Sequence, residues 1–171
     1  METSSSNQIE NPNPIIFNQE KIINKNRLLN EQDEDMVDLI DEEEVYDIIK
    51  NINDPEHPLT LEQLNVVNSK LIKIDKNLIS VFFTPTIPNC SMSTLIGLLI
   101  KVKLILSLPN IYKIDVFIEP GKHYLEDSIN KQLNDKERVY AAFENDQIKK
   151  LIRKGVENGL DFDEFQSNYV N

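Results

Sequence analysis

The sequence predicts an α+β domain, a two-layer sandwich of helices on a small three-stranded sheet in the order α-β-β-α-β-α. Three observations predict it. Residues 78–106 have the pattern of a buried strand, a turn with two prolines and a long apolar helix. Residues 111–119 alternate between apolar and polar side chains, as a half-buried strand does. Residues 41–51 place apolar side chains three and four positions apart behind several acids, which is typical of an amphipathic helix.

Composition limits the possible partners and location of the chain. The chain has 171 residues, 40% of them hydrophobic, which is enough for one core. Its formal net charge of −11 would repel phosphates and anionic lipids, so we expect no direct nucleic-acid binding and no membrane binding. No apolar run reaches the roughly 20 residues that span a bilayer, and the N-terminus lacks the pattern of a signal peptide. We therefore expect a protein of the cytoplasm, with the nucleus as a second location.

The chain divides by composition into three parts. Residues 1–35 form a head rich in Asn, Ser and Gln, which we expect to be disordered and, up to about residue 30, dispensable for folding. Residues 36–152 carry the periodic apolar patterns of the domain. Residues 153–171 contain two glycines and an acidic segment, and we expect them to be a tail.

The first half of the domain predicts a helix, a turn and a hairpin. The helix covers residues 41–51 and ends before Pro55, which cannot continue it. The acidic run of residues 31–44 is interpreted as a solvated surface rather than a metal site. Thr60 and Gln63 have the spacing of a capping box around a short turn. Two strands, residues 66–74 and 78–83, form a hairpin around Asp-Lys-Asn.

The second half predicts a helix, a strand and a last helix. Residues 91–107 are apolar nearly all round and should form the central buried helix, with Gly97 packed closely on the sheet. Residues 111–119 form the third strand with Ile114, Val116 and Ile118 turned inward. The last helix covers residues 126–145 and has an apolar face and a supporting ion pair, Asp127 with Lys131. The apolar face comprises Ile129, Leu133, Tyr140 and Phe143.

Cys90, the only cysteine, is the main candidate for chemistry. We place it at or next to the N-cap of the central helix, where the helix dipole favours a thiolate. The alternative is a small buried side chain that fills space. His123 could approach Cys90, and either His123 or His57 could hold a metal or tune the thiol, although isolated histidines are more often capping or surface residues. The sequence contains no glycine-rich phosphate loop, no HExxH and no GxSxG.

Three stretches together resemble one known family. They are residues 54–67 (DPEHPLTLEQLNVV), 83–104 (FTPTIPNCSMSTLIGLLIKVKL) and 119–144 (EPGKHYLEDSINKQLNDKERVYAAFE). They closely resemble the eukaryotic cytosolic iron–sulfur assembly component 2 proteins, more like the B form. Asp54, Pro55 and Glu56 match that family's first motif and Cys90 its reactive cysteine. His123 stands where B-like members place a histidine.

The resemblance implies an adaptor in the cytosolic iron–sulfur targeting complex, which delivers clusters to apo-proteins. The implied partners are a WD40 β-propeller subunit, a HEAT-repeat scaffold subunit and apo iron–sulfur clients, with a link to chromosome segregation. A homodimer is left open. We expect a protein that is not an enzyme and has no resident cofactor. Whether Cys90 and His123 hold an iron–sulfur cluster or a metal transiently is left open. The alternative function is a thiol-dependent redox or acyl-transfer enzyme with Cys90 as nucleophile and His123 as base.

Overall fold

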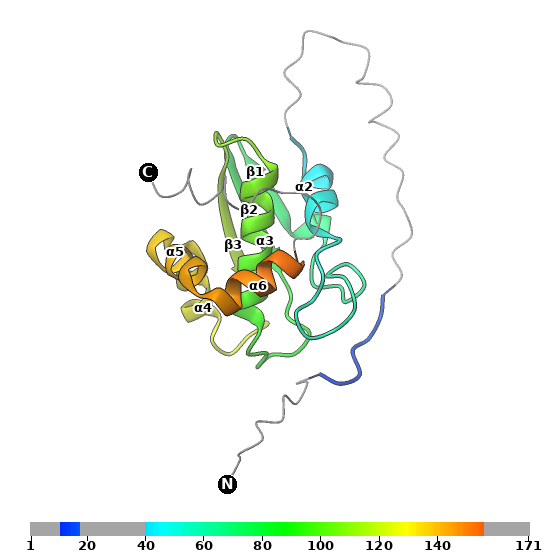
Figure 1. The fold of residues 1–171 in the computed structure, drawn as a ribbon. Helices are drawn as coiled ribbons and strands as arrows, with labels where there is room; N and C mark the ends of the chain where they lie inside the picture. The colour runs from blue at the N-terminus through cyan, green and yellow to red at the C-terminus, as the bar shows by residue number, and fades with distance from the viewer. Residues whose placement is uncertain (1–10, 18–39, 156–171) are drawn as a thin grey trace.

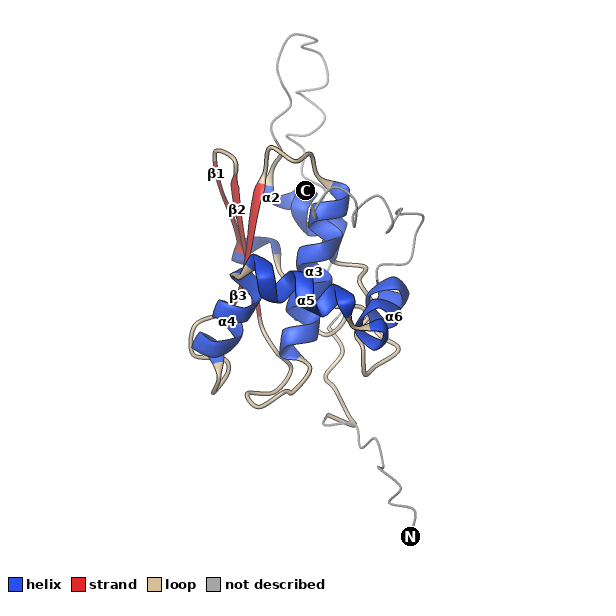
Figure 2. Cartoon of the chain, turned by 60° about the vertical axis from the view of Figure 1, so that its left-hand side comes forward, coloured by secondary structure: helices blue, strands red, loops and turns tan. Residues whose placement is uncertain are grey.

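The structure is a computed structural model that describes residues 11–17 and 40–155. It confirms the α+β class and the order α-β-β-α-β-α, with the last helical part divided into three helices (Figures 1 and 2). The strands are β1 (Ile72–Asp75), β2 (Leu78–Phe83) and β3 (Lys113–Ile118). The helices are α2 (Glu42–Ile49), α3 (Ser93–Ser107), α4 (Glu126–Asn134), α5 (Lys136–Glu144) and α6 (Asp146–Gly155).

The sheet has the order β1-β2-β3, antiparallel between β1 and β2 and parallel between β2 and β3. The predicted hairpin is confirmed, and Lys76 adopts a left-handed φ of 55° in its tight turn. The predicted start of the first strand at residue 66 was wrong, because a 3₁₀ turn (Ser69–Leu71) precedes β1. The side chain of Asn68 accepts a hydrogen bond from the Lys70 N–H, and such local bonds compete with strand pairing. Val66 and Val67 are nevertheless fully buried.

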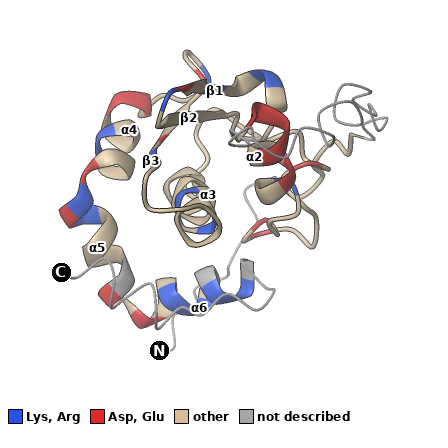
Figure 3. Cartoon of the chain, turned by 90° about the horizontal axis from the view of Figure 1, so that it is seen from above, with Lys and Arg blue, Asp and Glu red and all other residues tan. Residues whose placement is uncertain are grey.

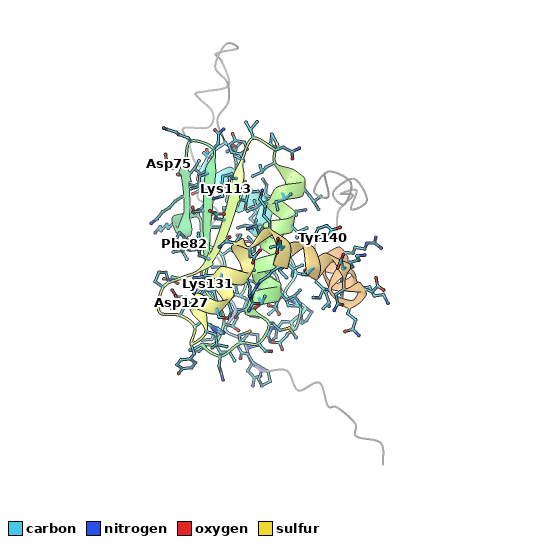
Figure 4. The ribbon with its side chains drawn as sticks, turned by 90° about the vertical axis from the view of Figure 1, so that its left-hand side faces the viewer. Asp75, Phe82, Lys113, Asp127, Lys131 and Tyr140 are labelled. Atoms are coloured by element: carbon cyan, nitrogen blue, oxygen red, sulfur yellow. The ribbon has the colours of Figure 1, made fainter. Side chains whose placement is uncertain are left out.

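Helix α3 occupies the centre of the molecule. Figure 3 shows the sheet on one side of it, α2 on another, and α4, α5 and α6 around the rest. The predicted inward residues of β3 are buried and belong to the same core as α3. A helix that is covered on most sides should be apolar nearly all round, which confirms the interpretation of this segment. On the other face of the sheet, the Phe82 and Phe117 rings stack with centroids 5.4 Å apart (Figure 4).

Gly97 is packed closely, but against α4 rather than the sheet as predicted. A Cβ at this position would lie 2.4 Å from Cδ1 of Leu133, a fully buried side chain of α4. The absence of a side chain on α3 therefore lets the two helices approach each other.

The predicted helix of residues 126–145 is two helices, because Asp135 interrupts it. Asp135 has extended backbone angles (φ −89°, ψ 114°), and its side chain accepts from the Glu137 N–H, which starts α5 afresh. Asn145 caps α6 in the same way through the N–H groups of Gln147 and Ile148. The predicted apolar face is buried at Ile129 and Leu133 and half-buried at Tyr140, and the Phe143 side chain lies outside the described residues. Asp127 and Lys131 are exposed on α4 (Figure 4).

The free edge of β3 is capped by α4. The Oδ1 atoms of Asn134 and Asn130 accept from the N–H groups of Val116 and Ile118 at 3.0 and 2.8 Å. The Asn134 amide also donates to the Val116 C=O at 2.9 Å. These bonds replace those that a fourth strand would supply, because edge groups of a sheet need partners.

Part of the predicted disordered head contacts the domain. Residues 11–17, drawn blue in Figure 1, run beside the loop between α2 and β1. The Phe17 N–H donates to the Gln63 C=O at 2.7 Å, and the ring of His57 meets the Asn11 C=O. The rest of the head, residues 1–10 and 18–35, lies outside the described residues, as do residues 156–171 of the predicted tail. Within the described residues, none of the helices has the length and apolar character required to cross a membrane.

Candidate functional site

The candidate site lies at the end of the sheet where the parallel strands β2 and β3 both finish. Two loops leave from this end, residues 84–92 toward α3 and residues 119–125 toward α4. Binding sites in sheets with parallel strands commonly form at this position. Two bonds join the loops where they begin: the Glu119 N–H donates to the Phe83 C=O at 2.8 Å, and Thr84 Oγ1 donates to Glu119 Oε2 at 2.5 Å.

Cys90 is held in the first loop, immediately before α3. Its N–H donates to the Ile87 C=O and its C=O accepts from the Ser93 N–H, both at 3.3 Å. Two prolines in this loop restrict its backbone. The Cys90 side chain is only 3% exposed. A reagent or partner therefore needs the loop to open before it can reach the sulfur.

Helix α3 begins later than predicted. Its N-cap is Met92, without a side-chain capping bond, so Cys90 stands two residues before the cap. The helix dipole acts mainly within the first turn, which reduces its effect on the Cys90 thiol. The reactivity of this thiol stays a prediction. Ser93, the first helical residue, is fully buried, and its Oγ has no hydrogen-bond partner among the described residues.

His123 does approach Cys90, but through the backbone. Its Nε2 lies 3.1 Å from the Cys90 C=O, and its Nδ1 lies 3.0 Å from the Leu125 backbone N. Because the Leu125 N–H must donate, Nδ1 is the unprotonated nitrogen and Nε2 carries the proton toward Cys90. The ring is buried, with 9% exposed. His123 is thus a neutral ring that joins the two loops, reinforced by the Tyr124 N–H bond to the Pro88 C=O at 3.1 Å.

This arrangement limits what Cys90 and His123 can do together. A metal or a substrate proton at His123 would require one of its two ring hydrogen bonds to break. Across residues 11–17 and 40–155, no group of three or more His, Cys, Asp or Glu side chains is placed to hold a metal ion. An iron–sulfur cluster at Cys90 would therefore need further ligands from outside this part of the chain.

The aspartate of the DPE motif organises a second cluster around His57. Asp54 Oδ1 accepts from the N–H groups of Glu56 and His57, both at 2.8 Å, and lies 2.9 Å from His57 Nδ1. His57 is 7% exposed and its Nε2 lies 2.6 Å from the Asn11 C=O. His57 therefore serves the turn and the N-terminal segment rather than the thiol.

Sequence reasoning missed one buried cation beside the α3–α4 interface. Lys101 Nζ donates to the Leu133 C=O at 2.7 Å and to Asn134 Oδ1 at 3.0 Å, which satisfies the C-terminal end of α4. Burial lowers the pKa of Lys101 to about 8. The available signal was that Lys101 and Lys103 are the charged residues of a helix that is otherwise almost entirely apolar.

Comparisons with known proteins identify the family of the chain. A family described as "Iron-sulfur cluster assembly protein" matches residues 42–116. The chain is 51% identical over 149 residues to "MIP18 family protein galla-2" of Drosophila melanogaster, covering 86% of this chain and 94% of that protein. It is 50% identical over 153 residues to "Cytosolic iron-sulfur assembly component 2B" of Mus musculus, covering 88% and 93%. The protein of the same name in Dictyostelium discoideum is 49% identical over 147 residues, covering 79% and 89%. These matches confirm the resemblance found in the sequence, and the chain belongs to the MIP18 family of cytosolic iron–sulfur assembly component 2 proteins.

Proposed function

We propose that this chain acts in cytosolic iron–sulfur protein assembly, as an adaptor subunit that helps deliver clusters to apo-proteins of the cytoplasm and nucleus. The observation that carries the proposal is the identity of 50% over 88% of the chain to a protein named cytosolic iron–sulfur assembly component 2B. The proposed partners are a WD40 β-propeller subunit, a HEAT-repeat scaffold and the apo-clients. A link to chromosome segregation would follow from clients that act on DNA.

Cys90 is the residue that we propose meets the cargo or a client. The cluster is cargo, so one protein ligand on this chain is sufficient if the donor or the client supplies the others. His123 would act indirectly as a positioning residue, because its Nε2–H holds the Cys90 carbonyl and hence the turn that presents the thiol. The burial of Cys90 favours exposure of the sulfur only when a partner opens the loop.

The ring geometry of His123 weighs against the enzyme alternative. A general base needs an unprotonated nitrogen within hydrogen-bond reach of the thiol. The nitrogen directed at Cys90 carries a proton that it donates to the backbone carbonyl, and the other nitrogen is occupied by the Leu125 N–H. Proton transfer from the thiol would require the buried ring to exchange both bonds.

The test combines partner recovery with iron delivery. The full chain is tagged and purified from cells as the natural protein, as Cys90→Ser and as Ser93→Ala. Ser93→Ala is the matched control in the same turn, because it removes a buried Oγ that has no hydrogen-bond partner within the described part of the chain. We expect all three proteins to melt at similar temperatures and to recover a β-propeller and a helical-repeat protein. We expect iron incorporation into a client to fall with Cys90→Ser only.

Three outcomes would contradict the proposal. Recovery of neither partner by the folded full chain would remove the adaptor role. Equal losses of client iron in both variants would assign the effect to the turn rather than the sulfur. Unchanged client iron with Cys90→Ser would leave Cys90 as a structural residue.

A further inference from the structure

His57 faces two hydrogen-bond acceptors at once. Its Nδ1 lies 2.9 Å from Asp54 Oδ1 and its Nε2 lies 2.6 Å from the Asn11 C=O. A backbone carbonyl can only accept, and an ionised carboxylate can only accept as well. Both contacts are hydrogen bonds only when both ring nitrogens carry protons, so the geometry requires a charged imidazolium.

The surroundings of the ring favour that charge. Burial by itself would lower the pKa of His57, but the hydrogen bonds to the Asn11 carbonyl and the Asp54 carboxylate, with the nearby negative charge of Glu56, raise it above its ordinary value of 6.5. Asp54 and Glu56 are on the same loop as His57, and residues 11–17 contain no ionisable side chain. The interaction that the segment itself contributes is therefore the carbonyl of Asn11.

We propose that His57 is a proton-dependent latch that fastens residues 11–17 to the folded domain. When the ring loses one proton, the remaining proton stays on Nδ1, because a lone pair there would face the negative charge of Asp54. Nε2 then directs its lone pair at the Asn11 oxygen across 2.6 Å, and two acceptors at that distance repel each other. The latch opens on the side of the N-terminal segment.

Among the described residues, the other hydrogen bond between this segment and the domain runs from the Phe17 N–H to the Gln63 C=O. Ile15 and Ile16 beside it are 74% and 57% exposed, whereas Phe17, at 42% exposed, and the partly buried Pro14 add a modest apolar contact. One backbone hydrogen bond contributes only about 1 kcal/mol net. Loss of the His57 contact should therefore weaken the attachment of the whole described segment.

The direction of the pH effect follows from the raised pKa. The Asn11 carbonyl raises the pKa of His57 only in the docked state, so attachment is strongest below the undocked pKa and is lost as the pH rises through the docked value. Between the undocked and docked pKa values, one proton is released on opening. The docking equilibrium constant should then fall by about tenfold per pH unit at most.

The test is nuclear magnetic resonance on the full chain between pH 5.5 and 8.5. Side-chain nitrogen spectra should show two protonated nitrogens on His57 at the acid end and the Nδ1–H form at the alkaline end. Hydrogen-exchange protection of the Phe17 amide should fall over the same interval.

Two variants separate the latch from a general pH effect. Asp54→Asn keeps an Oδ1 that can accept from the Glu56 and His57 N–H groups but removes the charge, so release should move to lower pH. His57→Gln should abolish the pH dependence at Phe17. Phe17 protection that stays constant over this pH range, or that falls equally in His57→Gln, would overturn the proposal. If His57→Gln does not fold, an unshifted release in Asp54→Asn would overturn it instead.

Discussion

Replacing Gly97 with Ala tests how closely α3 and α4 pack. The new Cβ would lie 2.4 Å from Cδ1 and 2.8 Å from Cδ2 of Leu133, well inside ordinary contact distance. Leu133 is fully buried and has little room to move. Ala improves helix propensity by up to about 1 kcal/mol, whereas overpacking a core costs about 1–3 kcal/mol. Because the overlap is large, we expect Gly97→Ala to lower the free energy of unfolding by about 1–2 kcal/mol.

A double-mutant cycle identifies the cause. Leu133→Ala alone should cost about 2–5 kcal/mol, because it leaves a cavity. In that background the clashing atoms are gone and the new methyl partly fills the cavity, so Gly97→Ala should instead stabilise by about 1 kcal/mol. Urea unfolding of the four proteins measures both effects. Stabilisation by Gly97→Ala in the natural protein, or additive effects of the two changes, would refute the close contact between Gly97 and Leu133.

Gly121→Ala is the control for this cycle. Gly121 has a φ of 78°, and no atom of residues 11–17 or 40–155 lies within 4 Å of the position that a Cβ would take. The change should cost about 1–2 kcal/mol through backbone strain alone. Because no contact with Leu133 is involved, that cost should be the same with and without Leu133→Ala.

Three further predictions concern the core, the sheet edge and Lys101. Leu99 is 1% exposed, so Leu99→Ala should lower the free energy of unfolding by about 2–5 kcal/mol in urea, and a loss below about 1 kcal/mol would place α3 at the surface. Asn134→Leu should cost about 1–3 kcal/mol by leaving the N–H and C=O groups of Val116 without their partners, and an unchanged exchange rate of the Val116 amide would contradict the edge cap. Since the pKa of Lys101 is lowered to about 8 in the fold, the unfolded chain binds more protons above that pH. The stability of the natural protein relative to Lys101→Met should therefore rise between pH 8 and about 10.4, and a flat difference would show that the Lys101 pKa is not lowered.

The sequence predicted the presence of Cys90 and His123 in one site, but not their geometry. The two residues are 33 positions apart. Their meeting depends on β2 and β3 ending at the same edge of the sheet, and strand order cannot be obtained from the pattern of one strand. The contact of His123 with the Cys90 backbone, rather than the thiol, depends on how the two loops pack. The same limit applies to His57, whose partner Asn11 lies 46 positions away.

The sequence alone determined those elements that depend on interactions between residues close together in the chain. Asp41 and Glu44 form the capping box at the start of α2. In β3, the side chains that the alternating pattern of residues 111–119 places on the inner face are buried. These features depend on residues a few positions apart, so the pattern itself contains their cause. The tertiary structure decided the rest. Gly97 packs on Leu133 and Asn134 caps the edge of β3 because α4 lies beside both α3 and β3. Such contacts join segments that are far apart in the sequence and come together only in the folded chain. They depend on how the side chains fit together and on which backbone groups of the sheet edge still need hydrogen-bond partners.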